Sequence, residues 1–291
     1  MKVLKNIILF FFFFCLINTN LSIIHADYDP DDYQWVEGGH KIEFGNKLAD
    51  ITLPSKFLFL PTDELIRFQK ENGNIPSGYE VGSVHPVNLE ENWLVVFEYY
   101  PVGYVSDLDY LHINDESLLT DYIIGTTQSN KDRGVNKEVE IIGWKDKPSY
   151  NPKRHELTYS LFFRDAFGKT QINYFVRLLS RNGYMSATLV TDVTRFDDDL
   201  QTMKETILPF IEWKEDEKYD AYNQSKDGKP KLNIAELVKQ SLGIEKTINS
   251  DEKENKHSNS NSISRIIILS VIISIILIIV IKYRVLLKRK N

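Results

Sequence analysis

The chain has 291 residues, a formal net charge of -6, 42% hydrophobic residues and one cysteine. The hydrophobic share is ample for a packed core, and the length allows one large domain or two small ones. The negative charge argues against a general nucleic-acid binder, and the single cysteine excludes an internal disulfide framework or a multi-cysteine metal site.

Residues 1–26 have the three parts of a secretory signal peptide. Lys2 and Lys5 precede an uninterrupted apolar run over 7–17, and a polar stretch ends at Ala26. A basic start, an apolar segment of about 7–15 residues and a small residue at the exit are typical of such peptides. The apolar run is too short to span a bilayer. We expect cleavage after Ala26, which also removes Cys15, the only thiol.

The first half of the following domain mixes strand and helix periodicity. The predicted elements are a strand at 51–54, a strand at 57–60, a helix at 63–71 and a strand at 93–100. The last of these alternates between two largely apolar faces, which predicts an inner strand. Asn114 is expected to cap a helix. That helix carries one apolar face made of Leu118, Leu119, Tyr122 and Ile123.

The second half is dominated by strands. Residues 139–144 and 155–163 predict two of them, and Asn182-Gly183 predicts a type I′ hairpin turn between two more. Pairing Arg181 with Tyr184 would place Leu178 opposite Ala187 and Val176 opposite Leu189. The acidic run 197–199 predicts a helix start, because negative charge there suits the helix dipole. The buried stripe of this helix is expected at Leu200, Met203 and Ile207. Adjacent hairpins and partly segregated helices predict an α+β fold with an antiparallel sheet and packed helices.

The C-terminal part predicts a membrane tether. Residues 245–264 are rich in Asn, Ser, Lys and Glu and read as a flexible polar linker. The uncharged, mostly aliphatic core of 265–284 predicts a transmembrane helix, and 285–291 a basic cytoplasmic tail. The exported α+β domain then spans 27–244. We expect a single-pass protein of the cytoplasmic (inner) membrane, with the bulk of the chain extracytoplasmic and the C-terminus cytoplasmic.

No catalytic signature emerges from the motifs. The sequence contains no nucleophile elbow, P-loop or dinucleotide-binding glycine pattern. Five histidines follow the signal peptide, and none has a paired zinc-ligand spacing: His40, His85, His112, His155 and His257. We therefore expect no metal and no cofactor. Asp107 and Asp109 have the spacing of a carboxylate pair, for which an ordinary polar loop is the alternative.

Several stretches resemble one bacterial family. The stretches are Gly103-Tyr104-Val105-Ser106-Asp107 with Asp109, Gly125-Thr126, Asn130, Arg133-Gly134, Gly143-Trp144, Lys147-Pro148-Ser149-Tyr150, Asn173-Tyr174, Arg181-Asn182-Gly183-Tyr184 and Tyr219-Asp220-Ala221-Tyr222-Asn223. Their order and spacing resemble the predicted membrane-anchored proteins of domain-of-unknown-function family two-one-six-seven, over about residues 35 to 240. The resemblance implies a membrane-anchored bacterial protein of unknown activity and assigns no catalytic residues.

The expected function is non-catalytic binding in the cell envelope. The partner is expected to be an envelope protein, a peptide or a polar ligand. Taking away the charges of 1–26 and 265–291 leaves -14 on residues 27–264, which favours a basic or polar partner. The candidate binding surface consists of Asp107, Asp109, Asn130, Arg133 and Trp144, with an Asp–Arg pair that merely fixes the helix to a loop as the alternative. A cell-envelope hydrolase that uses Asp107 and Asp109 as acid and base is the alternative function, and it requires both to line a pocket.

Overall fold

A computed structural model describes residues 33–71, 76–88, 91–110, 113–133, 138–165 and 168–240. Apart from Tyr33, these residues belong to one compact unit that begins at Gln34. The predicted signal peptide, the polar linker, the transmembrane segment and the tail all lie outside the described residues. Within the described ranges, no helix combines the length and the apolar character needed to cross a membrane.

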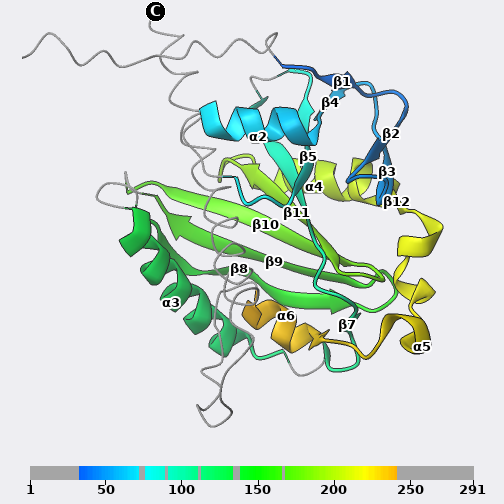
Figure 1. The fold of residues 1–291 in the computed structure, drawn as a ribbon. Helices are drawn as coiled ribbons and strands as arrows, with labels where there is room; N and C mark the ends of the chain where they lie inside the picture. Colours follow the sequence, from blue (N-terminus) through cyan, green and yellow to red (C-terminus); the bar gives the residue numbers. More distant parts are fainter. Residues whose placement is uncertain are drawn as a thin grey trace, which may run out of the picture. The chain divides into compact units, whose positions relative to one another are not determined.

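An antiparallel sheet of eight strands forms the centre of the described part (Figure 1). Its strands, in spatial order, are β1 (Val36–Glu37), β4 (Phe57–Leu60), β5 (Glu80–Pro86), β6 (Leu94–Tyr100), β11 (Tyr184–Thr191), β10 (Thr170–Leu179), β9 (Glu156–Arg164) and β8 (Glu140–Asn151). The sheet with its helices confirms the mostly antiparallel architecture expected from the sequence.

Two smaller sheets and several helices complete the described part. The small sheets are β12 (Ile211–Trp213), β3 (Ala49–Thr52) and β2 (Lys41–Phe44), and the parallel pair β13 (Leu232–Asn233) and β7 (Val105–Ser106). The α-helices are α2 (Thr62–Glu71), α3 (Asp115–Arg133), α4 (Phe196–Thr206), α5 (Gln224–Asp227) and α6 (Ile234–Gln240), and the 3₁₀ turns are η4 (Leu208–Phe210), η5 (Glu215–Glu217) and η6 (Tyr219–Ala221).

The main sheet has a hydrophobic core on each face, because its central strands place apolar side chains on both sides. Along β10, Val176 and Leu178 enter a first core together with Met203 of α4. Phe175 and Leu179 point the other way into a second core, to which α3 and α6 contribute. The alternation follows from the two-residue period of a strand. It explains why β6, β10 and β11 are buried along nearly their whole length.

Helix α3 begins where the sequence predicts. The side-chain oxygen of Asn114 accepts a hydrogen bond from the Ser117 N–H at 2.9 Å, which satisfies one of the free donors of the first turn. Leu118 and Tyr122 are buried as expected, whereas Ile123 is 43% exposed. The apolar face of α3 is therefore narrower than predicted.

The register of the β10–β11 hairpin differs from the prediction. Leu178 pairs with Met185 and Val176 pairs with Ala187, two residues away from the predicted partners Ala187 and Leu189. Because side chains alternate with a period of two, a shift of two residues keeps every apolar side chain on its predicted face. The predicted faces were right although the partners were wrong.

The turn of this hairpin explains the shift. Neither Asn182 nor Gly183 has the positive φ that a type I′ turn requires. The N–H of Arg181 instead donates to the carbonyl of Glu217, outside the hairpin. A Cβ on Gly183 would lie 2.0 Å from the carbonyl oxygen of Tyr100. Glycine is needed here for a close approach of two backbones rather than for a left-handed turn.

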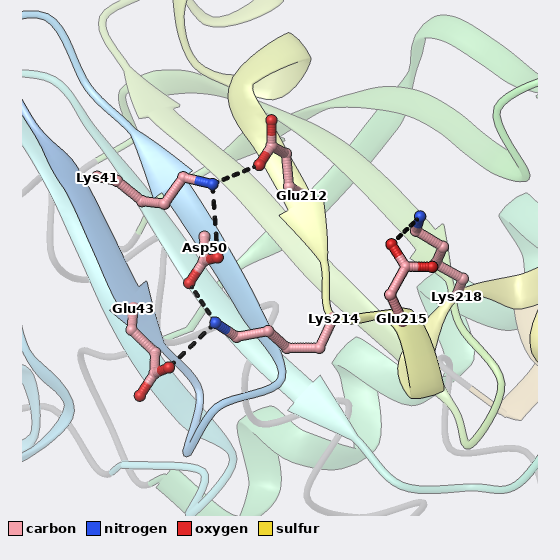
Figure 2. A network of polar contacts seen from close by, with 7 residues as sticks. All are labelled: Lys41, Glu43, Asp50, Glu212, Lys214, Glu215 and Lys218. Carbon is pink, nitrogen blue, oxygen red and sulfur yellow. Dashed lines mark hydrogen bonds and ion pairs between the residues drawn. The ribbon is translucent and has the colours of Figure 1, made fainter.

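A row of three carboxylates crosses the three-stranded sheet of β12, β3 and β2. Glu43 and Glu212 lie directly opposite Asp50 on the two neighbouring strands. Lys41 Nζ lies 2.7 Å from Glu212 and 3.7 Å from Asp50, and Lys214 Nζ lies 2.7 Å from Asp50 and 3.0 Å from Glu43 (Figure 2). Like charges directly opposite one another destabilise a sheet. The two lysines offset that repulsion and connect β12 to the other two strands.

Candidate functional site

Asp109 serves a structural purpose at the start of α6. Its Oδ1 accepts the N–H of Ile234 at 3.1 Å, and its Oδ2 accepts the N–H of Ala235 at 3.3 Å. A carboxylate at a helix N-terminus satisfies free backbone donors and suits the dipole. Both oxygens of Asp109 are thus directed at the backbone of α6 and not at Asp107.

Asn130 and Trp144 connect α3 with β8. The Asn130 amide donates to the Val139 carbonyl at 2.7 Å and accepts the Val139 N–H at 3.0 Å. Trp144 Nε1 donates to the backbone carbonyl of Asp115 at 3.2 Å. Arg133 ends α3, and its side chain lies outside the described part. Asn130 and Trp144 therefore bind the backbone at two different positions, Val139 and Asp115, and share no hydrogen-bond partner among these contacts.

Asp107 is different, because its carboxylate meets side chains from distant segments. Tyr150 OH donates to Asp107 Oδ2 at 2.7 Å, and His155 Nδ1 lies 3.1 Å from the same oxygen. A carboxylate only accepts hydrogen bonds, so this contact places a proton on Nδ1. His155 Nε2 lies 3.5 Å from Asp220 Oδ1. We call Asp107, Tyr150, His155 and Asp220 the Asp107 cluster.

Four aromatic rings form a column beside this cluster. Tyr222 stacks on Tyr104 at 3.7 Å between centroids, Tyr104 on Tyr219 at 4.6 Å, and Tyr219 on His155 at 4.0 Å. The Tyr219 hydroxyl donates to the Val105 carbonyl at 2.8 Å. Stacked aromatic rings stabilise the fold by more than the burial of their surface area alone. The column fixes the imidazole plane and attaches residues 219–222 to the loop after β6.

The backbone at His155 departs from the prediction of a strand. His155 lies in the turn between β8 and β9, with a φ of +47° that is uncommon outside glycine. Its carbonyl accepts the N–H of Leu179, which holds the turn against the end of β10. This conformation takes the imidazole out of the strand alternation and turns it to Asp107.

The cluster is open to solvent on one side. The side chains of Asp107 and His155 are 18% and 22% exposed, and that of Asp220 is 89% exposed. Burial, followed by the neighbouring Asp107, raises the pKa of Tyr150, so its hydroxyl stays protonated as a donor. The arrangement holds the imidazole between two carboxylates, one of which is largely exposed.

Ser83 and His85 form a separate polar contact, which is closed to solvent. Ser83 Oγ lies 2.8 Å from His85 Nε2, within the reach of a nucleophile and its base. Ser83 is 0% exposed and His85 4% exposed. Burial lowers the pKa of His85 to about 3, so the ring does not accept a proton at neutral pH. The pair satisfies buried polar groups and offers no accessible nucleophile.

Sequence reasoning identified Asp107 but missed His155, Tyr150 and Asp220. A usable signal was present, since Gly103–Asp107, Lys147–Tyr150 and Tyr219–Asn223 all belong to the stretches that resemble the bacterial family. The structure brings these three stretches together around Asp107. Among the described residues, no three His, Cys, Asp or Glu side chains gather in an arrangement that could hold a metal ion.

Comparison with known proteins gives a family match. The family described as "Protein of unknown function (DUF2167)" matches residues 36–248. No curated protein matches the chain. Among solved structures, the chain is similar to the solution structure of cyanobacterial PsbP (CyanoP) from Synechocystis sp. PCC 6803, at 11% identity. That similarity covers 62% of this chain and 92% of the other, with a TM-score of 0.37.

Proposed function

The chain belongs to the DUF2167 family of proteins of unknown function, and we propose that its domain is a non-catalytic binding module of the cell envelope. The partner binds at the Asp107 cluster. The observation that carries the proposal is the partly exposed His155, held between Asp107 and Asp220 where three distant stretches of the chain meet. An imidazole fixed in this way is already oriented, so a partner does not have to order it.

Charge and shape favour a basic or polar partner. Residues 27–264 carry a net charge of -14, and Asp220 projects into solvent beside the cluster. Leu108, next to Asp107, is 90% exposed and offers an apolar contact at the same place. Carboxylates around a small apolar anchor suit a lysine- or arginine-bearing loop of another envelope protein. Opposite charge also accelerates the encounter at low salt.

The hydrolase alternative lacks its second carboxylate. An acid and base pair requires both carboxylates to face a substrate. Both oxygens of Asp109 accept backbone N–H groups of α6. Asp107 is left with His155 and Tyr150, an arrangement that fits binding with fixed donors. We therefore do not extend the hydrolase hypothesis to this site.

A cross-linking experiment tests the binding proposal. A photo-reactive p-benzoylphenylalanine replaces Leu108 in the full-length chain in intact cells, and irradiation is expected to give a discrete adduct. Asp220→Lys should reduce the adduct by about threefold or more, because about 0.7 kcal/mol of lost attraction is threefold in affinity. Asp197→Lys is the matched control, since Asp197 is 88% exposed against 89% for Asp220 and lies on α4. Equal loss in both variants, or no adduct at Leu108, would contradict the proposal.

We also propose that the domain is exported and tethered by residues 265–284. This rests on the signal-peptide pattern of 1–26 and on the basic residues that follow the aliphatic segment. Cleavage after Ala26 removes the only thiol, so the mature chain suits single-cysteine mapping. Lys169→Cys should react with an impermeant maleimide in intact cells, and Leu287→Cys should react only after lysis. Labelling of Leu287→Cys in intact cells, or a mature chain that retains Cys15, would refute this topology.

A further inference from the structure

A short segment before β5 is fastened to the sheet by two buried glutamates. Glu80 accepts the N–H groups of Ser77 and Gly78 at 2.6 and 2.8 Å. Glu98 accepts the hydroxyl of Ser77 at 2.7 Å. The Tyr79 carbonyl accepts the N–H of Tyr99, so the backbone after this segment joins β6. We call residues 77–79 the strap.

The two glutamates lie directly opposite each other within the sheet. Glu80 of β5 pairs with Glu98 of β6, and each residue is 5% exposed. Side chains at directly opposite positions have Cβ atoms about 4.5–5.5 Å apart. Two carboxylates at that separation away from water repel strongly, and one proton on either of them removes most of the repulsion. The strap thus lies across a pair whose protonation decides its stability.

Charged and titratable groups from each neighbouring element of the described part act on Glu98 or on its neighbours. They include Glu80 from β5, Arg177 from β10, Tyr184 from β11 and Tyr100 from its own strand, with Ser77 and Tyr79 from the strap. Burial and then Glu80 raise the pKa of Glu98 to about 7, against the lowering effects of Ser77, Arg177 and Tyr100. Glu80 accepts two backbone N–H groups, and Glu98 is the carboxyl of the pair whose pKa is raised.

We propose that the strap is a pH-controlled clasp, closed over β5 and β6 while Glu98 is protonated and opened to water when Glu98 loses its proton. Opening relieves the repulsion because it hydrates two carboxylates that face each other without a neutralising proton. The device is separate from the Asp107 cluster and does not rest on the proposed binding function.

Opening the strap removes one ring from an aromatic stack. Tyr79 lies 4.8 Å from Tyr100, and Tyr100 lies 5.0 Å from Tyr184, between ring centroids. Tyr100 ends β6, and its carbonyl oxygen is the atom that Gly183 approaches closely. Release of Tyr79 therefore exposes the end of β6, at the point where the chain enters the loop that carries Tyr104.

Limited proteolysis measures the strap directly. The intact full-length chain, in mild detergent, is treated with chymotrypsin at pH 6 and pH 8.5, and mass spectrometry quantifies the fragment that ends at Tyr79. Rates are divided by the rate on a free tyrosine peptide at the same pH. A group with a pKa of about 7 goes from about one tenth ionised to almost fully ionised over this range. Cleavage of the wild-type chain should therefore rise about tenfold.

Three variants decide the interpretation. Glu98→Gln keeps the shape and cannot ionise, so its cleavage should change less than about twofold between the two pH values. Ser77→Ala and Glu80→Gln remove strap contacts, so both should be cleaved faster than the wild type at pH 6. Circular dichroism is used to check that each variant is folded. An equal rise in Glu98→Gln and the wild type, or no rise in the wild type, would overturn the clasp, and neither result bears on the binding proposal.

Discussion

Replacing Glu98 by glutamine should change how the free energy of unfolding depends on pH. The pKa of Glu98 rises from 4.5 to about 7 on folding, mainly through burial and then through Glu80. The folded chain therefore holds this proton more tightly than the unfolded chain. The stability that it contributes is complete below pH 4.5 and is lost as the pH rises through 7. At about 1.4 kcal/mol for each pKa unit, the loss amounts to about 3 kcal/mol.

The contribution of His85 to the free energy of unfolding changes with pH in the opposite direction. Burial lowers its pKa from 6.5 to about 3, so the folded chain keeps the ring neutral. That contribution is complete above pH 6.5 and is lost as the pH falls through 3, by about 5 kcal/mol. Between pH 4.5 and 6.5 the two groups oppose each other. Their sum is a stability plateau in that window, with a decline on the acid side from His85 and on the alkaline side from Glu98.

Urea unfolding of the full-length chain in mild detergent, followed by tryptophan fluorescence from pH 4 to 8.5, checks this reasoning. Subtracting the wild-type value from that of Glu98→Gln cancels the contributions of His85 and of the other groups that do not interact with Glu98. We expect the difference to be constant below pH 4.5 and to grow by about 3 kcal/mol in favour of the variant by pH 8. Glu205→Gln, at an exposed position of α4, should give a difference that does not change with pH. A Glu98→Gln difference that stays flat or shrinks as the pH rises would refute the reasoning.

Three further changes probe other parts of the fold by the same unfolding assay. Asn173→Leu should raise the free energy of unfolding by about 1–3 kcal/mol, because the amide is 0% exposed and neither of its polar atoms has a hydrogen-bond partner in the described part; a loss of stability would contradict this. Gly183→Ala should lower it by about 3 kcal/mol through the clash with the Tyr100 carbonyl, whereas Gly168→Ala, with nothing within 4 Å of the added Cβ, should lower it less. Lys214→Gln should lower it at low salt by leaving Asp50 and Glu43 less neutralised, and the effect should shrink in 1 M NaCl.

The elements that sequence patterns predicted well are those decided by local alternation. Residues 57–60 form β4 with the predicted bounds, and 94–100 form an inner strand with both faces covered. Helix α4 begins at Phe196 with its acidic first turn, as the run 197–199 indicated. In each case the period of the apolar residues is enough to predict the element, because burying one or both of its faces depends only on that local pattern.

The features that the sequence predicted wrongly depend on contacts between distant segments. The β10–β11 register moved by two residues because the turn pairs with Glu217, more than thirty residues further along the chain. His155 left the strand because the β8–β9 turn is held by Leu179 and the ring by Asp107, 48 residues away. The apolar pattern cannot predict such contacts, since a register shift of two residues or a single residue in a turn leaves that pattern unchanged.

Asp107 and Asp109 show why a candidate site cannot be read from residue type and spacing. They are the same residue type, two positions apart in one loop, and the spacing of the motif does not distinguish them. The segment that returns beside the loop separates their roles: α6 brings backbone N–H groups to Asp109, while the turn before β9 brings an imidazole to Asp107. Both oxygens of Asp109 accept backbone N–H groups of a helix N-terminus, whereas the Asp107 carboxylate accepts from an imidazole and a phenol. The difference between the two aspartates is thus made by the topology that places α6 next to β7 through the β7–β13 pair, more than 120 residues after the loop.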